Sequence, residues 1–291
     1  MDKTRLELAA KWRALMYVPA HVDKFHQKAA HVGADAIIFD LEDAVPAAQK
    51  EEARHKLPQA AALVRETGNS VLVRINREIE WGIADIEAAL AANADAVVVA
   101  KVEGPAHLTL LADYLDRHES RFERSHPLYL LPLVESLDAF WMMREIAGAS
   151  DRVIGMAMGG EDIAAQIHAA SGEDTLAWPR QQMIFAAATA GIAPFGLMGS
   201  IADFADPENV LRVARNSRRY GFWGATCIHP KQVGPIKTAF APTEAEIADA
   251  RQIVEALEAA TRAGRGAVEV NGRMIDAPVA ARARRIVALA R

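Results

Sequence analysis

The chain has 291 residues, 51% of them hydrophobic, and its 33 basic and 38 acidic residues give a formal net charge of −5. Because no block of basic residues occurs, the composition argues against a nucleic-acid partner, and no apolar run of about 18 residues is present to span a membrane. A single cysteine, Cys227, excludes an internal disulfide and a multi-cysteine zinc site. The first residues carry Asp, Glu and Arg where a signal peptide needs an apolar core, so we expect a cytoplasmic protein.

Short runs rich in Val, Ile, Leu and Met recur along the chain, and Ala-rich stretches long enough for helices separate them. In chain order the runs begin at Ala14, Ala36, Ser70, Ala96, Leu128, Arg152, Ala193 and Gly224. Continuously apolar strands are typical of parallel sheets buried on both faces, whose connections must be helical. One such helix has a good start in Asp206-Pro207, since Asp caps a helix and Pro fits its first turn.

Eight strand–helix units predict an α/β protein with a (β/α)8 TIM barrel over residues 1–240. The competing architecture is an open doubly wound sheet, but no GxGxxG turn follows the first run. Residues 241–291 are left over beyond a complete barrel, and we expect them to form a C-terminal helical extension.

Polar residues gather where the predicted strands end. In a TIM barrel these C-terminal ends form the active-site face. The residues found there are Asp40, Glu42, Asp43, Arg74, Asn76, Lys101, Glu135, Asp162 and His229. This rim is net acidic around one arginine and one lysine, and such a cluster requires a cation.

Glu135 and Asp162 are the candidate metal ligands, because they end neighbouring strands. Two carboxylates suit Mg2+, which binds few protein ligands and keeps several waters, whereas the lack of nearby Cys or paired His argues against zinc. The alternative is that both acids cap the helices that follow them, and spacing alone does not separate the two roles. Gly159-Gly160 favours the metal, since glycine allows close backbone approach.

Arg74 can clamp a substrate carboxylate, form a salt bridge to the acids after the second strand, or do both. The carboxylates around Lys101 should raise the pKa of its amine, so we expect an electrostatic or structural lysine rather than a nucleophile. His229 can act as a base, although a histidine before proline at a strand end more often pins a loop, and we favour that role.

The acids after the second strand, Asp40, Glu42 and Asp43, have several possible functions. They can bind metal-ligated waters, pair with Arg74 and Lys101, or act as a general base. A cation makes such a cluster tolerable.

Eight motifs occur in a characteristic order, and together they resemble a known family. They are "RALMYVPA", "FDLEDAV", "VRIN", "LPLVES", "GGEDIA", "YGFWGATCIHPKQV", "AFAPTEAEIADA" and "GRMIDAPVAARA". The chain from about Arg13 to Ala283 resembles the citrate lyase beta subunit-like branch of the HpcH/HpaI aldolase superfamily. One of these motifs alone would be weak evidence for the family, but eight motifs in this order are specific to it.

The resemblance implies a TIM barrel in which Glu135 and Asp162 hold Mg2+. It also implies that Arg74 binds the carboxylate and oxygen of a small 2-keto acid. Further substrate-binding candidates are Arg13, in the first motif, Lys101 and His229.

The resemblance further implies that residues 241–291 pack on a neighbouring subunit of a homotrimer or hexamer. Asp276, in "GRMIDAP", would then serve the partner's active site as an acid or base. The Asp276 role follows from the resemblance alone.

The activity implied is Mg-dependent cleavage of a carbon–carbon bond in a 3-hydroxyacyl-CoA thioester, such as malyl-, citramalyl- or citryl-CoA. The products would be a 2-keto acid and an acyl-CoA. Three alternatives stay open: a malyl-CoA thioesterase or synthase, an aldolase acting on free hydroxy-keto acids, and a citrate lyase beta subunit that depends on a carrier protein.

Overall fold

The computed structural model describes residues 3–202 and 204–290, and the chain divides into two compact units, Met1–Phe240 and Ala241–Arg291. The first unit contains an eight-stranded parallel sheet with the order β7-β6-β5-β4-β3-β2-β1-β8. Its strands are β1 (Ala14–Pro19), β2 (Ala36–Asp40), β3 (Ser70–Ile75), β4 (Ala96–Val99), β5 (Tyr129–Val134), β6 (Gly155–Met158), β7 (Ala193–Phe195) and β8 (Ala225–Cys227).

The two ends of the sheet meet and close it into a barrel. An isolated parallel bridge joins Phe195 to Gly224, and the Gly196 amide donates a hydrogen bond of 2.9 Å to the Gly224 carbonyl. On the other side of β8, the Ala225 amide donates to the Arg13 carbonyl at 2.8 Å. The predicted TIM barrel is therefore confirmed, and the open doubly wound alternative is excluded.

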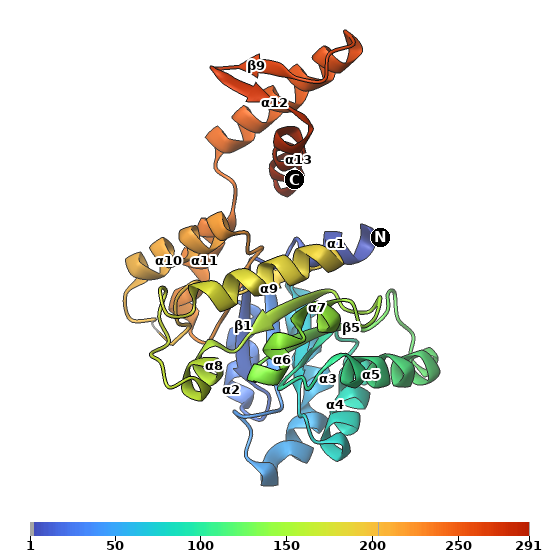
Figure 1. The fold of residues 1–291 in the computed structure, drawn as a ribbon. Helices are drawn as coiled ribbons and strands as arrows, with labels where there is room; N and C mark the ends of the chain where they lie inside the picture. The colour runs from blue at the N-terminus through green and yellow to red at the C-terminus, as the bar shows by residue number, and fades with distance from the viewer. Residues whose placement is uncertain (1–2, 203, 291) are drawn as a thin grey trace. The chain divides into compact units, whose positions relative to one another are not determined.

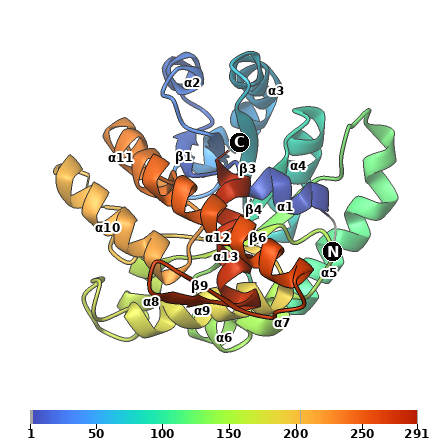
Figure 2. The ribbon, with the colours of Figure 1, turned by 90° about the horizontal axis from the view of Figure 1, so that it is seen from above.

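Helices of the first unit surround the strands (Figures 1 and 2). They are α1 (Lys3–Ala9), α2 (Asp23–Ala30), α3 (Lys50–Glu66), α4 (Ile79–Ala91), α5 (Pro105–His118), α6 (Leu137–Trp141), α7 (Met143–Ala147), α8 (Gly160–Gln166), α9 (Ala177–Ala190), α10 (Pro207–Tyr220) and α11 (Pro230–Phe240). Helix α10 begins as predicted, because the Asp206 side chain accepts hydrogen bonds from the Glu208 and Asn209 amides.

Side chains of each strand alternate between two apolar cores. Leu15, Ile38 and Leu72 belong to the core that fills the barrel, whereas Ile37, Val71 and Val97 belong to the larger core between the strands and the helices. Because both faces of the sheet are buried, the strands read as continuous apolar runs. The packed barrel interior leaves the C-terminal strand ends as the place for polar chemistry.

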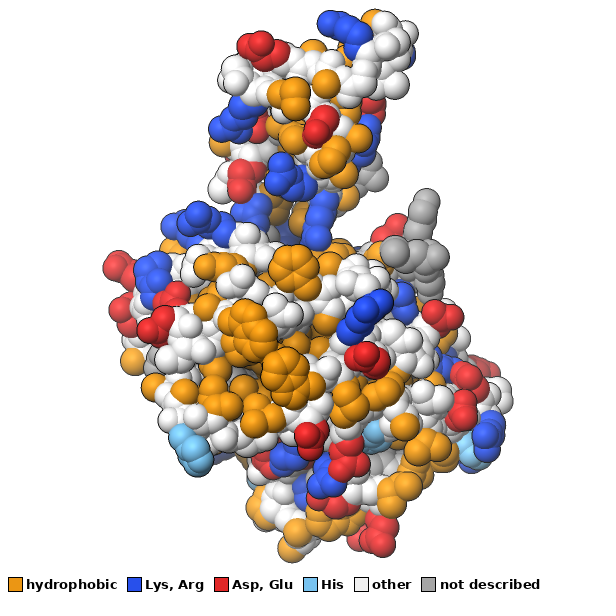
Figure 3. Space-filling view, viewed as in Figure 1, with side chains coloured by type: hydrophobic (Ala, Val, Ile, Leu, Met, Phe, Trp, Pro, Cys, Tyr) orange, Lys and Arg blue, Asp and Glu red, His pale blue; other side chains and the backbone are white. Residues whose placement is uncertain are grey.

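A patch of apolar side chains lies on the outer surface over α6 and α9 (Figure 3). The exposed aromatic residues of these helices are Trp141, Trp178 and Phe185, and the ring centroids of the two tryptophans are 6.0 Å apart. Contiguous exposed apolar surface commonly marks a binding face.

The second unit consists of α12 (Glu244–Arg262), the hairpin strands β9 (Val268–Val270) and β10 (Arg273–Ile275), and α13 (Ala277–Leu289). Thr243 and Glu246 form a capping box at the start of α12. Asn271 and Gly272, both with positive φ, make the hairpin turn. Ile253, Leu257 and Ile275 are among the residues of this unit's own small core. Across both units, no described helix combines the length and apolarity needed to cross a membrane.

We expect Gly224→Ala to lower the free energy of unfolding by about 3 kcal/mol or more. A Cβ at this position would overlap the Trp12 carbonyl oxygen and lie 2.7 Å from the Arg13 carbonyl oxygen, so β8 could no longer pack on β1. Gly148→Ala is the control, since its Cβ would meet only the Arg144 carbonyl oxygen at 3.7 Å. Chemical denaturation measures both, and a Gly224→Ala protein as stable as the control would contradict this account of barrel closure.

Candidate active site

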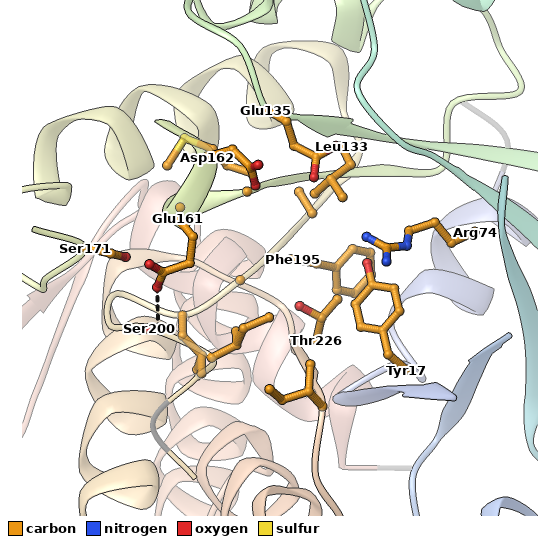
Figure 4. A pocket seen from close by; sticks show the side chains of 18 of the residues that line it. Tyr17, Arg74, Leu133, Glu135, Glu161, Asp162, Ser171, Phe195, Ser200 and Thr226 are labelled. Atoms are coloured by element: carbon orange, nitrogen blue, oxygen red, sulfur yellow. Dashed lines mark hydrogen bonds between the residues drawn. The ribbon is translucent and has the colours of Figure 1, made fainter. Parts of the chain in front are cut away.

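The C-terminal strand ends surround a cavity of about 490 Å³. Its polar lining includes Tyr17 from β1, Asp40 at the end of β2, Arg74 from β3, Glu135 directly after β5 and Asp162 near the start of α8. All of these except Asp40 are labelled in Figure 4. Its apolar lining includes Leu133, Met158, Phe195 and Leu197. A concave site with a few convergent polar groups on an apolar wall is the usual form of a small-molecule pocket.

Glu135 and Asp162 flank the same glycine. A Cβ built on Gly159 would lie 2.6 Å from Cγ of Glu135 and 2.8 Å from Oδ2 of Asp162. Both carboxylates point into the cavity in Figure 4. A side chain at position 159 would force the two acids to move, so glycine permits the close backbone approach that the glycine pair suggests.

Neither acid makes a side-chain capping bond, although Asp162 lies in the first turn of α8, where the helix dipole favours an acid. Helix α6 is capped by Ser136, whose side chain accepts from the Ala139 amide, and the N-cap of α8, Gly159, has no side-chain cap bond. Instead, the Gln166 amide group donates to the backbone carbonyls of Glu135, at 2.7 Å, and Asp162, at 3.0 Å. This side chain ties the two backbones together and leaves both carboxylates to the cavity.

Negative charge is concentrated around Glu135. Burial raises the pKa of its carboxyl to about 7; the Lys101 amide opposes this shift, and the charges of Asp162 and Glu42 add to it. Within the described ranges, no group of three or more His, Cys, Asp or Glu side chains is arranged to hold a metal ion. Two carboxylates whose remaining neighbours would be water or substrate oxygens match Mg2+ rather than zinc.

Arg74 forms the predicted salt bridge to acids at the end of β2. Its Nε and Nη2 donate to the two carboxylate oxygens of Asp40 at 2.8 and 2.6 Å, and its Nη1 lies 3.2 Å from Oε2 of Glu42. Burial opposes the charge of Arg74, but the paired Asp40 outweighs it and raises the pKa of the guanidinium. This two-pronged pair places the guanidinium at the cavity wall.

The Lys101 side chain pairs with acids at the end of β2, which is consistent with the electrostatic or structural role expected from the sequence. Its amine donates to Glu42 and to Asp43, the latter at 3.0 Å, and these bonds outweigh burial and raise the pKa of the amine. A raised pKa leaves no free amine for nucleophilic attack. The backbone of Lys101 is left-handed, with a φ of 47°, and its amide donates to Oε2 of Glu135 at 2.6 Å.

A buried polar network below the rim was not predicted from the sequence. The Lys50 amine donates to the carbonyls of Leu41 and Glu42 and to Oδ1 of Asn76, while Asp85 accepts from the Asn76 amide and side chain. These bonds fix the turn that presents the acids after β2. Asp85 is fully buried on α4, and an acid on the helix face whose other buried residues are apolar is the signal that could have identified it.

Arg13 and His229, two of the predicted site residues, lie apart from this group. Arg13 precedes β1, at the opposite end of the barrel from the cavity, because it sits at the N-terminal end of a strand. His229 is not part of the cavity lining; its ring stacks on Phe204 and accepts from the Lys231 amide, so it pins the turn into α11. Asp276 belongs to the second unit, where it caps α13 by accepting from the Val279 amide.

The family model described as HpcH/HpaI aldolase/citrate lyase matches residues 13–230. The chain belongs to this family. Its match spans the whole barrel from the start of β1 to the start of α11, so the family covers every element that contributes to the cavity.

Known members of the HpcH/HpaI family resemble the chain over nearly its whole length. The citrate lyase subunit beta of Leuconostoc mesenteroides subsp. cremoris is 34% identical over 96% of this chain and 93% of its own. The mitochondrial citramalyl-CoA lyase of Rattus norvegicus is 30% identical over 96% of this chain and 86% of its own.

A solved structure of the family gives the same fold. The protein CitE from Mycobacterium tuberculosis, in complex with magnesium, acetoacetate and coenzyme A, is 28% identical and has a TM-score of 0.74. The match covers 97% of this chain and 98% of that one, so it includes the C-terminal unit as well as the barrel.

Proposed function

We propose that this protein is a Mg-dependent lyase that cleaves a carbon–carbon bond in a 3-hydroxyacyl-CoA thioester, giving a 2-keto acid and an acyl-CoA. The observation that carries the proposal is the pair of carboxylates, Glu135 and Asp162, that share Gly159 in a cavity bordered by Arg74. The named relatives support it, since one is a citramalyl-CoA lyase and another binds magnesium and coenzyme A. The acid half of the substrate is malyl-, citramalyl- or citryl-like.

Glu135 and Asp162 would hold the Mg2+ ion. Their oxygens are hard donors, and their backbones are fixed by Gln166. Burial first, and then the charges of Asp162 and Glu42, raise the pKa of Glu135, and a bound cation would favour its charged form. When bound, the metal supplies Lewis-acid polarisation of the substrate's hydroxyl and carboxylate oxygens.

Arg74 and Asp40 have different proposed roles beside the metal ligands. Arg74 borders the cavity and offers positive charge to the carboxylate of the acid half and to the charge that develops as the bond breaks. Asp40 holds Arg74 in place and also accepts from the amides of Glu42 and Ala44, so its oxygens are fully occupied. We therefore assign Asp40 to positioning rather than to proton transfer.

Proton transfer from the substrate hydroxyl needs a carboxylate with a free oxygen. Glu42 is buried and bound by Lys101, Arg74 and the Asp43 amide. Asp43 is the exposed member of this cluster, but its carboxylate is paired with the Lys101 amine. We propose that Asp276 from a neighbouring subunit is the acid or base. Its cap bond to Val279 uses one carboxylate oxygen and leaves the other available.

This assignment requires an assembly, which we propose to be a homotrimer or hexamer in which residues 241–291 pack on the next subunit. The second unit has its own core and is compact by itself, as a segment that reaches over a neighbour must be. The exposed aromatic patch over α6 and α9 offers apolar surface for such an assembly.

Glu135→Gln and Asp162→Asn should each weaken Mg2+ binding and lower lyase activity by roughly 100-fold or more, because Lewis-acid stabilisation is worth several kcal/mol. Isothermal titration with Mg2+ and a keto-acid release assay measure the two effects. Asp138→Asn is the matched control, an exposed acid on α6 outside the cavity lining, and it should leave both unchanged. Full metal-dependent activity in either cavity variant would refute the metal assignment.

Co-expression of Asp276→Asn with Glu135→Gln should restore activity that neither variant has alone. If a site combines Glu135 of one chain with Asp276 of its neighbour, random mixing leaves about one quarter of the sites intact. Keto-acid release from the purified mixed oligomers, beside each variant alone, measures the recovery. Inactive mixtures of folded oligomers would show that Asp276 does not serve a neighbouring site.

A further inference from the structure

Tyr17 faces the cavity from β1, in a position that reads from sequence as one more core residue of an apolar strand. Its ring lies against Arg74, with the guanidinium carbon 5.0 Å from the ring centroid. Within the described part of the chain its hydroxyl has no hydrogen-bond partner. Figure 4 shows this hydroxyl next to the Arg74 guanidinium, on the side of the cavity opposite Glu161 and Ser171.

Arg74 alone is a poor clamp for a substrate carboxylate. Its Nε and Nη2 already make the two-pronged pair with Asp40, and its Nη1 is close to Glu42. Two carboxylates therefore balance its single charge before any substrate arrives, which weakens its attraction for a further carboxylate even though some of its N–H groups remain available. A neutral donor beside Arg74 would strengthen the binding of a substrate carboxylate at this wall.

The Tyr17 hydroxyl has the properties of that donor. Burial raises its pKa, and the charges of Asp40, Glu135 and Glu42 raise it further while Arg74 opposes them, so the hydroxyl keeps its proton. It is electrically neutral, and it adds a hydrogen bond without adding a charge that the acidic rim would neutralise. The hydroxyl lies beside the Arg74 guanidinium at the cavity wall, where the acid half of the substrate would lie.

We propose that the Tyr17 hydroxyl binds the substrate directly, donating a hydrogen bond to the carboxylate of the 2-keto acid half beside Arg74. This inference rests on the proposed function, because it takes the ligand class from it. The competing role is purely structural: the ring would support Arg74 and the hydroxyl would contribute nothing. Tyr17→Phe keeps the ring and removes the hydroxyl, whereas Tyr17→Leu removes both.

The experiment measures the dissociation constant of pyruvate in the presence of Mg2+ by isothermal titration, together with KM and kcat for thioester cleavage. Tyr17→Phe should raise the dissociation constant and KM by roughly 10-fold, as expected for loss of a hydrogen bond to a charged group, and should change kcat by less than about 3-fold. Tyr114→Phe is the matched control, since its hydroxyl bonds to Glu87 on the outside of the barrel. It should behave as wild type.

The outcomes separate the two roles. Weaker binding in Tyr17→Phe, with Tyr17→Leu at least as weak, supports substrate binding by the hydroxyl. Unchanged binding in Tyr17→Phe overturns the inference, whatever Tyr17→Leu does. Pyruvate binding tests this inference, whereas thioester cleavage tests the proposed function. If the wild-type protein binds pyruvate but cleaves no thioester, the proposed lyase activity is contradicted, and the binding constants of the Tyr17 variants can still be compared.

Discussion

Two carboxylates held against one glycine repel each other, and the site depends on how the protein supports that contact. Glu135 and Asp162 meet across Gly159, and the raised pKa of Glu135 records the cost of burying charge there. Hydrogen bonds hold the two acids in place. The Gln166 side chain donates to the backbone carbonyls of both Glu135 and Asp162, and the backbone amide of Lys101, which has a left-handed conformation, donates to the Glu135 carboxylate. A bound cation would complete this arrangement by neutralising the pair.

The positive groups of the rim are engaged in the same balance. Arg74 and Lys101 are each paired with the acids at the end of β2, so the positive charge of the rim is already compensated while an excess of acidic groups remains. Such pairing gives rigidity rather than affinity, because a neutralised guanidinium attracts a further anion weakly. Metal, arginine and a neutral hydroxyl from Tyr17 would then share the recognition of the substrate, each through a different physical interaction.

The sequence was sufficient for the barrel and for the carboxylate pair, because apolar strand runs and the polar residues that end them are local patterns. Arg13 lay outside this logic, since it precedes its strand and therefore lies at the far end of the barrel. Lys50 and Asp85 were missed because each pairs with a residue far along the chain, Lys50 with Asn76 and Asp85 with Arg54. Tyr17 was missed because a tyrosine within an apolar strand has the pattern of a core residue. Asp276 could be named only through family resemblance.

The most direct test of the account is incubation of the wild-type protein with malyl-, citramalyl- and citryl-CoA, following release of the 2-keto acid with Mg2+ and after EDTA. The account predicts that one ester is cleaved to equal amounts of keto acid and acyl-CoA, that EDTA stops the reaction, and that restored Mg2+ recovers it. Release that persists after EDTA, or free CoA appearing without a keto acid, would contradict a Mg-dependent lyase.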